Sequence, residues 1–218
     1  QGANMPSDAL KAKLKQSQEL HSEPSRIRLH RAISWLARSE KETGDSDAQI
    51  IFLWIAFNAA YAKLFGFEKT EREQLQLFIE TLVFSDKEKR LQKSLFEQFS
   101  GPIRVLIENK YVFEPFWRDL REHDDSGRWQ LQFDESKKLA LRAVMANQTE
   151  IVLTIVFDRL YVLRNQLIHG GATWNSKVNR SQVHDAVKIL NSLIPIIIDL
   201  MLDHPDLEFG ETLYPVVG

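Results

Sequence analysis

The chain has 218 residues, of which 44% are hydrophobic and 27% charged, and its formal net charge at pH 7 is −2. This is the profile of an ordinary globular protein, long enough to bury one sizeable core. The lack of Cys excludes disulfides and thiolate metal sites and fits a reducing compartment, while the slightly negative charge excludes a general nucleic-acid coat, so any contact with nucleic acid must be local.

The first five residues resemble a tag remnant that ends at a native initiator, Met5. No secretory signal is recognisable. The longest apolar stretch, Ile50 to Ala62, covers about 13 residues and includes Asn58, whereas a membrane span needs roughly 20 residues. We therefore expect a cytoplasmic protein with no membrane contact, in which Asn58 is buried and makes a structural hydrogen bond.

Helical periodicity runs through nearly the whole chain. Ser22 followed by Pro24 predicts a helix start, and that helix should end near Lys41. A break at Gly44 precedes the next helix, which is apolar nearly all round, is closed by Gly66, and should lie at the centre of a bundle.

The middle of the chain predicts shorter helices, over residues 70–84, 86–99, 101–109 and 135–146, and residues 111–133 predict a short helix and a loop. A long helix should run from Thr149 to His169, where Gly170 and Gly171 stop it. A last one should run from about Ser181 to Asp203, with a kink at Pro195, before an irregular tail over residues 204–218. We predict one all-α domain over residues 6–218, with an insertion at about 67–147.

The strongest functional signal lies at the end of the long helix, in the segment from Arg164 to His169. At about 100° per residue, one apolar stripe of this helix must face the core, formed by Leu153, Val156, Leu160, Leu163 and Leu167. Asp158, Asn165 and His169 share another arc, and Arg164 lies at its edge. The glycines allow the last turn to loosen, so the side chains of Arg164 and His169 can converge.

This combination of a cation, an amide, a carboxylate and an imidazole suits phosphate chemistry. A guanidinium is a permanently charged fork for phosphate oxygens. An imidazole can move a proton near neutral pH, and an amide can orient a hydroxyl or hold the imidazole tautomer. We therefore take Arg164, Asn165 and His169 as candidate catalytic residues, with Asp158 and Tyr161 in supporting roles.

The pattern Arg164-Asn165-x3-His169 resembles the Arg-polar-x3-His signature of HEPN domains, a family found in toxin–antitoxin, abortive-infection and CRISPR-associated ribonucleases. The order of elements is also similar to the HEPN helical bundle: a buried helix around Trp54, the motif helix, the glycines with Trp174, and a long apolar final helix. The resemblance covers residues 22–66 and 148–204, and the stretch between them has no counterpart in the family.

What this resemblance implies is an endoribonuclease that needs no metal and leaves a 2′,3′-cyclic phosphate and a 5′-hydroxyl. His169 would be the general base or acid, Arg164 would stabilise the phosphorane charge, and Asn165 would position His169 or the phosphate. HEPN sites of this type are usually formed by two motifs that face each other across a two-fold axis. Since this chain has one such motif, the resemblance implies a homodimer through the motif helix, RNA as substrate, and a protein antitoxin or regulator as a further partner.

Structural interpretations of the same residues remain open. Arg164 and His169 could cap helix carbonyls, with Arg164 also paired to Asp158 or to a Glu, and Asp158 is better explained as such a partner than as a catalyst. Trp174 fits equally well as a base-stacking residue or as a loop residue held against the bundle, and Lys177 and Arg180 are candidate nucleic-acid contacts. A basic run favours a solvated helix face over an RNA-facing stripe: Arg26, Arg28, His30, Arg31 and Arg38.

Other chemistries have no support in the sequence. The remaining histidines lack the spacing of metal ligands, and the chain has neither a Gly-rich phosphate loop nor a Gly-x-Ser-x-Gly elbow, so we predict no metal and no cofactor. A non-catalytic HEPN-like module that binds RNA, a nucleotide or a protein remains the alternative function, because the net charge is negative. The intact set of Arg164, Asn165 and His169 favours the enzyme.

Overall fold

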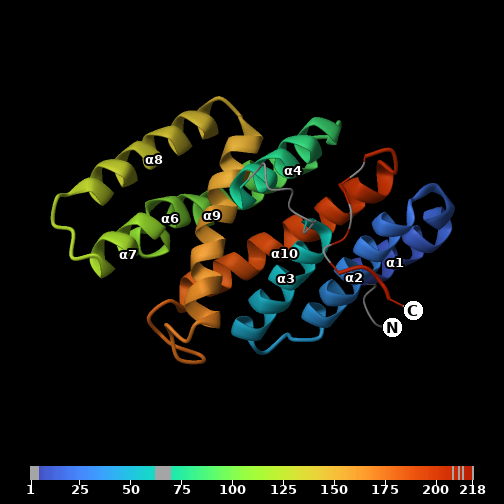
Figure 1. Ribbon diagram of the computed structural model, residues 1–218, viewed down its shortest axis with the longest axis horizontal. Coiled ribbons are helices and arrows are strands. Elements are labelled where there is room, and N and C mark those ends of the chain that lie inside the picture. Colours follow the sequence, from blue (N-terminus) through green and yellow to red (C-terminus); the bar gives the residue numbers. More distant parts are fainter. Residues whose placement is uncertain (1–4, 62–69, 208, 211, 213, 218) are drawn as a thin grey trace. The chain divides into compact units, whose positions relative to one another are not determined.

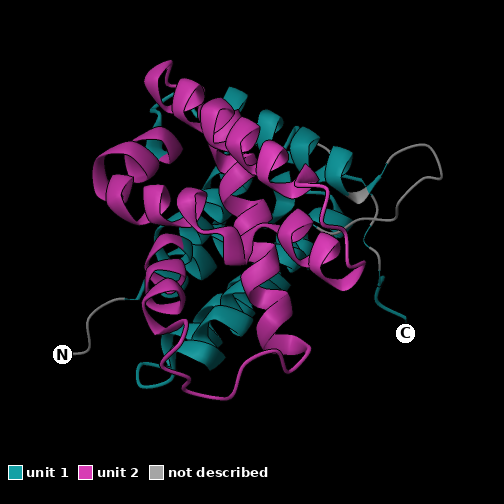
Figure 2. Cartoon of the chain, turned by 90° about the vertical axis from the view of Figure 1, so that its left-hand side faces the viewer, with its two compact units in different colours: residues 1–90, 190–218 teal, residues 91–189 magenta. Residues whose placement is uncertain are grey.

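The fold is described by a computed structural model that covers residues 5–61, 70–207, 209–210, 212 and 214–217. Every regular element in these ranges is a helix, so the predicted all-α class is confirmed. The chain forms two compact units, Gln1–Arg90 with Leu190–Gly218, and Leu91–Ile189 (Figure 2). These bounds differ from those of the expected insertion at 67–147, and the single domain stays a prediction.

Unit 1 contains α1 (Pro6–Ser17), a short 3-10 turn η1 (Gln18–Leu20), α2 (Glu23–Glu40), α3 (Ser46–Tyr61), α4 (Glu71–Ser85) and the second half of α10 (Arg180–Asp203) (Figure 1). The start of α2 follows the prediction, because the Ser22 side chain accepts a hydrogen bond from the Ser25 amide. The α4 start has a full capping box between Thr70 and Glu73. Helix α1 is an addition to the predicted elements, and Gly66 lies outside the described residues.

The core of unit 1 forms where α2 and α3 pack along each other. Helix α3 is buried over most of its surface, as its apolar sequence predicts, although Asn58 is only half-buried. Aromatic rings extend this core, since Phe57 stacks on Tyr61 at 5.6 Å and Phe78 meets Phe209 edge-on at 5.2 Å. Largely buried apolar side chains of the two helices include Leu29, Ala32, Ile33, Leu36, Ile50, Leu53, Trp54 and Phe57.

Arg28 corrects the interpretation of the basic run in α2. Its side chain is 1% exposed, and its guanidinium donates hydrogen bonds to the carbonyls of Ala60 and Gly210, at 3.1 and 3.0 Å. Burial lowers its pKa to about 10. Arg28 therefore belongs neither to a solvated face nor to an RNA-facing stripe, but ties α2 to distant backbone of its own unit.

An ion-pair network fixes α10 within unit 1. Lys13 on α1 lies 2.6 Å from Asp199 and also binds Asp203, while Arg90 binds Asp199 and lies 3.3 Å from Asp203. Burial alone would raise the pKa of the Asp199 carboxyl, but the hydrogen bonds and charges of Lys13 and Arg90 outweigh it and hold that pKa below its ordinary value. The ionised carboxylate therefore stabilises the fold.

We expect Asp199→Asn to lower the free energy of unfolding at pH 7 by about 1–2 kcal/mol, because it removes two charge-assisted contacts. Since the folded-state pKa is depressed, this contribution is present above the unfolded pKa of about 4 and disappears as the pH falls through the lower folded value. Urea denaturation between pH 7 and pH 2.5 measures both effects. Asp206→Asn, an exposed control, should change little, and an equal loss in both variants would contradict the role of the network.

Unit 2 contains α5 (Arg90–Lys93, with Arg90 itself in unit 1), the π-helical segment Ser94–Gln98, α6 (Ser100–Glu108), a 3-10 turn η3 (Lys110–Val112), α7 (Glu114–Arg121), α8 (Arg128–Met145), α9 (Thr149–Ile168) and the first half of α10 (Figure 1). The regular helix expected over 86–99 is wrong, since α5 is short and passes into the π-helix. Helix α8 begins earlier than Glu135, so Trp129 is helical and not part of a loop.

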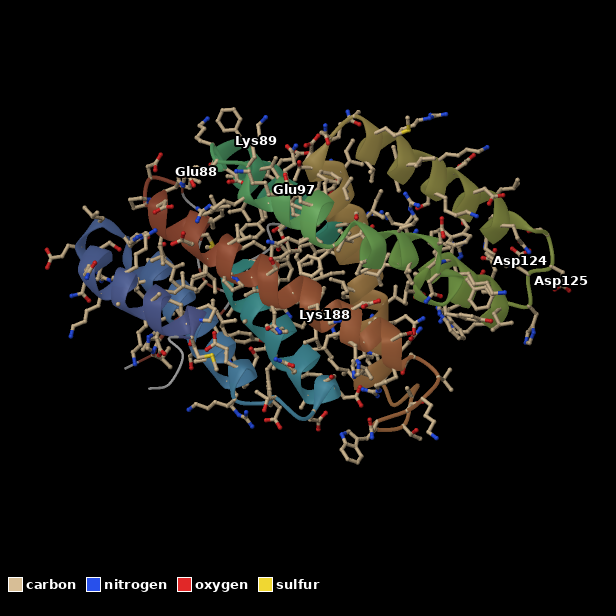
Figure 3. All side chains as sticks on the ribbon, turned by 180° about the vertical axis from the view of Figure 1, so that it is seen from behind. Glu88, Lys89, Glu97, Asp124, Asp125 and Lys188 are labelled. Atoms are coloured by element: carbon tan, nitrogen blue, oxygen red, sulfur yellow. The ribbon has the colours of Figure 1, made fainter. Side chains whose placement is uncertain are left out.

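The start of α8 has a clear local cause. Gly127 adopts a left-handed conformation with φ of 80°, which reverses the chain after a loop that carries Asp124 and Asp125 (Figure 3). Arg128 then donates to the buried carboxylate of Asp119 on α7 at 2.8 Å, and Arg118 also contacts it at 2.9 Å. The hydrogen bond from Arg128 lowers the pKa of Asp119.

Helix α9 is the centre of the unit 2 core, and η3, α6 and α8 pack against it. Four members of the predicted stripe, Leu153, Val156, Leu160 and Leu163, are buried, and Leu167 is half-buried. No helix in the described part of the chain is both long and apolar enough to cross a membrane. The core thus fixes one face of α9 along its length and leaves its C-terminal turn half-buried or exposed.

Candidate functional site

The C-terminal end of α9 is a Schellman motif. The amide of Gly171 donates to the carbonyl of Gln166 at 2.7 Å, and the amide of Gly170 donates to that of Leu167 at 3.3 Å. Gly170 has φ of 69°, and His169 is the C-cap residue. The predicted stop at the two glycines is therefore confirmed, and it places His169 at the last position before the chain reverses.

Each glycine has its own reason to be there. Gly170 needs a left-handed backbone, which costs other residues free energy. A Cβ at Gly171 would lie 3.1 Å from the carbonyl oxygen of Gln166, closer than ordinary packing allows. The turn after His169 is thus tight because of Gly171 and reversed because of Gly170.

Arg164 lies one turn before the end of the helix and is half-buried. Its guanidinium carbon lies 4.8 Å from the centre of the Tyr161 ring, a cation–π contact. Tyr161 is exposed, and the Arg164 guanidinium packs against the face of its ring. This contact limits where the Arg164 guanidinium lies, and the supporting role of Tyr161 in a site stays a prediction.

Asn165 and His169 follow on the same side of the helix, four residues apart. The amide oxygen of Asn165 is buried and accepts no hydrogen bond from any described residue. The His169 side chain is exposed, and no described group hydrogen-bonds its imidazole. The helix end thus combines a buried amide acceptor with an imidazole open to solvent.

Asp158 is half-buried two turns earlier on α9. Its neighbour Arg159, which the sequence did not single out, is buried instead. The Arg159 guanidinium lies 4.7 Å from the Phe113 ring centre and donates to the Ser136 hydroxyl at 2.9 Å. Arg159 is thus a structural cation that joins α9 to α8 and to Phe113, the residue after η3, and only the fold distinguishes it from Arg164.

The loop after the glycines carries the predicted nucleic-acid contacts. Trp174 is 74% exposed, which leaves most of its indole open to a stacking partner, and Lys177 is exposed as well. Arg180, the first residue of α10, is half-buried and donates from Nε to the carbonyl of Ser176 at 3.1 Å. Arg180 therefore closes the loop at its far end, and Trp174 and Lys177 are its outward-facing members.

The turn η3 lies beside the end of α9. The carbonyl of Tyr111 accepts hydrogen bonds from the Gln166 amide at 2.6 Å and from the Trp117 indole at 2.9 Å. Around it, the rings of Tyr111, Phe116 and Trp117 contact one another. The Lys110 ammonium lies over the rings of Tyr111 and Phe116. The dense aromatic composition of residues 111–133 was the only sequence signal for this neighbour, and its place beside the motif was not predictable.

Comparison with protein-family models, with curated proteins and with solved structures found no match to this chain. The HEPN resemblance therefore rests on the motif, the glycines and the order of helices. Within the described ranges, His, Asp and Glu side chains form no group of three or more that could hold a metal ion.

We expect Gly170→Ala to lower the free energy of unfolding by about 1 kcal/mol, because alanine disfavours the left-handed backbone at this position. Gly101→Ala is the matched control, since Gly101 lies in the first turn of α6 and an added Cβ there meets nothing within 4 Å. Urea denaturation of both variants measures the difference. Equal stability of the two variants would mean that the Schellman motif does not determine the end of α9.

Proposed function

We propose that the end of α9 is the active site of a metal-independent endoribonuclease of the HEPN type. The observation that carries the proposal is the Schellman turn, which holds His169 at an exposed helix end one turn beyond Arg164. Arg164 rests on the Tyr161 ring, so its position is restricted before any substrate binds. A guanidinium and an imidazole at one helix end suit the transfer of a phosphate ester.

In the proposed reaction an RNA 2′-hydroxyl attacks the phosphorus on its 3′ side. An imidazole removes the hydroxyl proton as the bond between O2′ and phosphorus forms, and the bond between phosphorus and O5′ breaks. A second acid gives a proton to the departing 5′ oxygen, so the products are a 2′,3′-cyclic phosphate and a 5′-hydroxyl. Arg164 stabilises the negative charge that builds on the phosphorane oxygens.

A homodimer would supply the second acid. The reaction needs one group to accept a proton and another to donate one, and the motif of a single chain carries one imidazole, that of His169. An isologous two-fold contact through the end of α9 would bring two copies of His169 to the same phosphate.

The alternative function is a non-catalytic module that binds RNA through the same helix end and the Trp174 loop. One observation favours it: no described group orients the His169 imidazole, whereas a catalytic histidine is normally held by a hydrogen bond. Trp174 and Lys177 could still retain RNA by stacking and charge. The two functions differ in whether RNA is cut.

Cleavage of a mixed-sequence RNA in EDTA distinguishes them. We expect wild-type protein to cut RNA, and His169→Ala and Arg164→Ala each to lose about 100-fold or more in rate, as typical of a lost acid–base group or charge stabiliser. His184→Ala and Arg142→Ala are matched controls on exposed helical positions, and they should keep the wild-type rate.

Two results would contradict the enzyme. Wild-type protein that shifts RNA on a native gel but leaves it intact would identify the binding module. Equal rates of RNA cleavage by wild type and His169→Ala would show that His169 takes no part in the reaction, even if both proteins bind RNA.

A further inference from the structure

A pocket of about 380 Å³ lies within unit 2, between the π-helical segment Ser94–Gln98, α6 and α8. It is half-open to solvent, and its volume falls in the range of small-molecule sites. None of the motif residues of α9 lines it. Its apolar lining comes from all three elements: Leu95, Phe96, Ile103, Ile107, Leu141 and Val144.

One residue that lines the pocket is a large apolar side chain exposed to solvent. Leu141 on α8 is 57% exposed and lies at the pocket. Leu95 and Ile103, by contrast, are buried. The pocket thus has an apolar floor that continues to an apolar mouth, where a bound molecule would cover Leu141.

The charges around the pocket are not balanced. Lys137 lies 3.1 Å from Asp134, so these two lining residues neutralise each other. Arg104, Lys138 and Glu108 also line the pocket, and none of the three has an ion-pair partner among the described residues. The lining of the pocket therefore carries one excess positive charge, although the net charge of the whole chain is −2. This local positive charge favours the binding of a ligand with an anionic group.

The backbone of the pocket wall is an independent sign of a site. Leu95 and Phe96 belong to the π-helical segment, whose residue Glu97 is exposed on the surface (Figure 3). A π-helical turn is rare in proteins and is frequently found at functional sites. Here it directs two large apolar side chains to one pocket.

We infer that this pocket binds a small amphipathic molecule, with an apolar body against the floor and an anionic group at Arg104 and Lys138. This site is separate from the proposed ribonuclease site and does not depend on it. Medium-chain carboxylates are the simplest molecules of this class.

Octanoate, octanol and octylamine, each below its micellar concentration, test the inference by isothermal titration calorimetry. All three share one apolar chain and differ in the charge of the head group. We expect octanoate to bind about tenfold more tightly than octanol, and octylamine to bind most weakly, because the charged contact adds to the shared apolar burial. No saturable binding of octanoate, equal binding of octanoate and octanol, or preference for octylamine would each overturn the inference.

Variants locate the site. Leu141→Glu should weaken octanoate at least tenfold, whereas Leu139→Glu, which adds the same charge at a 49% exposed position of α8 outside the pocket, should stay within twofold of wild type. The double variant Arg104→Gln/Lys138→Gln should lose the preference for octanoate over octanol. The control Arg142→Gln/Lys188→Gln removes two exposed charges of unit 2 outside the pocket and should keep that preference. Lys188 is labelled in Figure 3. Equal effects within either matched pair would place the binding outside this pocket.

Discussion

The left-handed backbone of Gly170 is the constraint on which the candidate site depends, since it ends α9 at a defined residue. Without that reversal, the helix would continue and His169 would lie inside it. With it, two amides turn back to the carbonyls of Gln166 and Leu167, and His169 becomes an exposed C-cap. A single backbone conformation therefore determines where the backbone of His169 lies relative to Arg164, one turn earlier.

Gln166 connects this turn to the rest of unit 2. Its carbonyl accepts from Gly171, and its side-chain amide donates to Tyr111 in η3, so one residue of the motif holds both the loop that follows and the aromatic group beside it. Arg164 is restricted by Tyr161, and Arg159 anchors the preceding turn against Phe113. The proposed catalytic groups thus sit on a helix end whose neighbours are fixed by packing, which is the arrangement that preorganised chemistry needs.

Structural features that depend on neighbouring residues could be predicted from the sequence, whereas contacts between residues far apart in the chain could not. Ser22 and Gly170 act on neighbouring residues through caps and backbone conformation, so both were predictable. Arg28 was misassigned because its acceptors, Ala60 and Gly210, lie 32 and 182 residues away along the chain. Helical periodicity also could not distinguish Arg159, which is buried, from Arg164, which is half-buried. The π-helical turn at Ser94–Gln98 interrupts a pattern that reads as regular helix, and the pocket it lines follows from tertiary packing alone.

The most direct measurement of the central claim compares an RNA that wild-type protein cuts in EDTA with the same RNA carrying a 2′-O-methyl group at the cleaved position. If His169 and Arg164 promote attack by the 2′-hydroxyl, the unmodified RNA should yield a 2′,3′-cyclic phosphate and a 5′-hydroxyl, and the methylated RNA should remain intact at that position. Cleavage of the methylated position at the unmodified rate, or products that carry a 5′-phosphate, would show that the nucleophile is not the 2′-hydroxyl and would contradict the account.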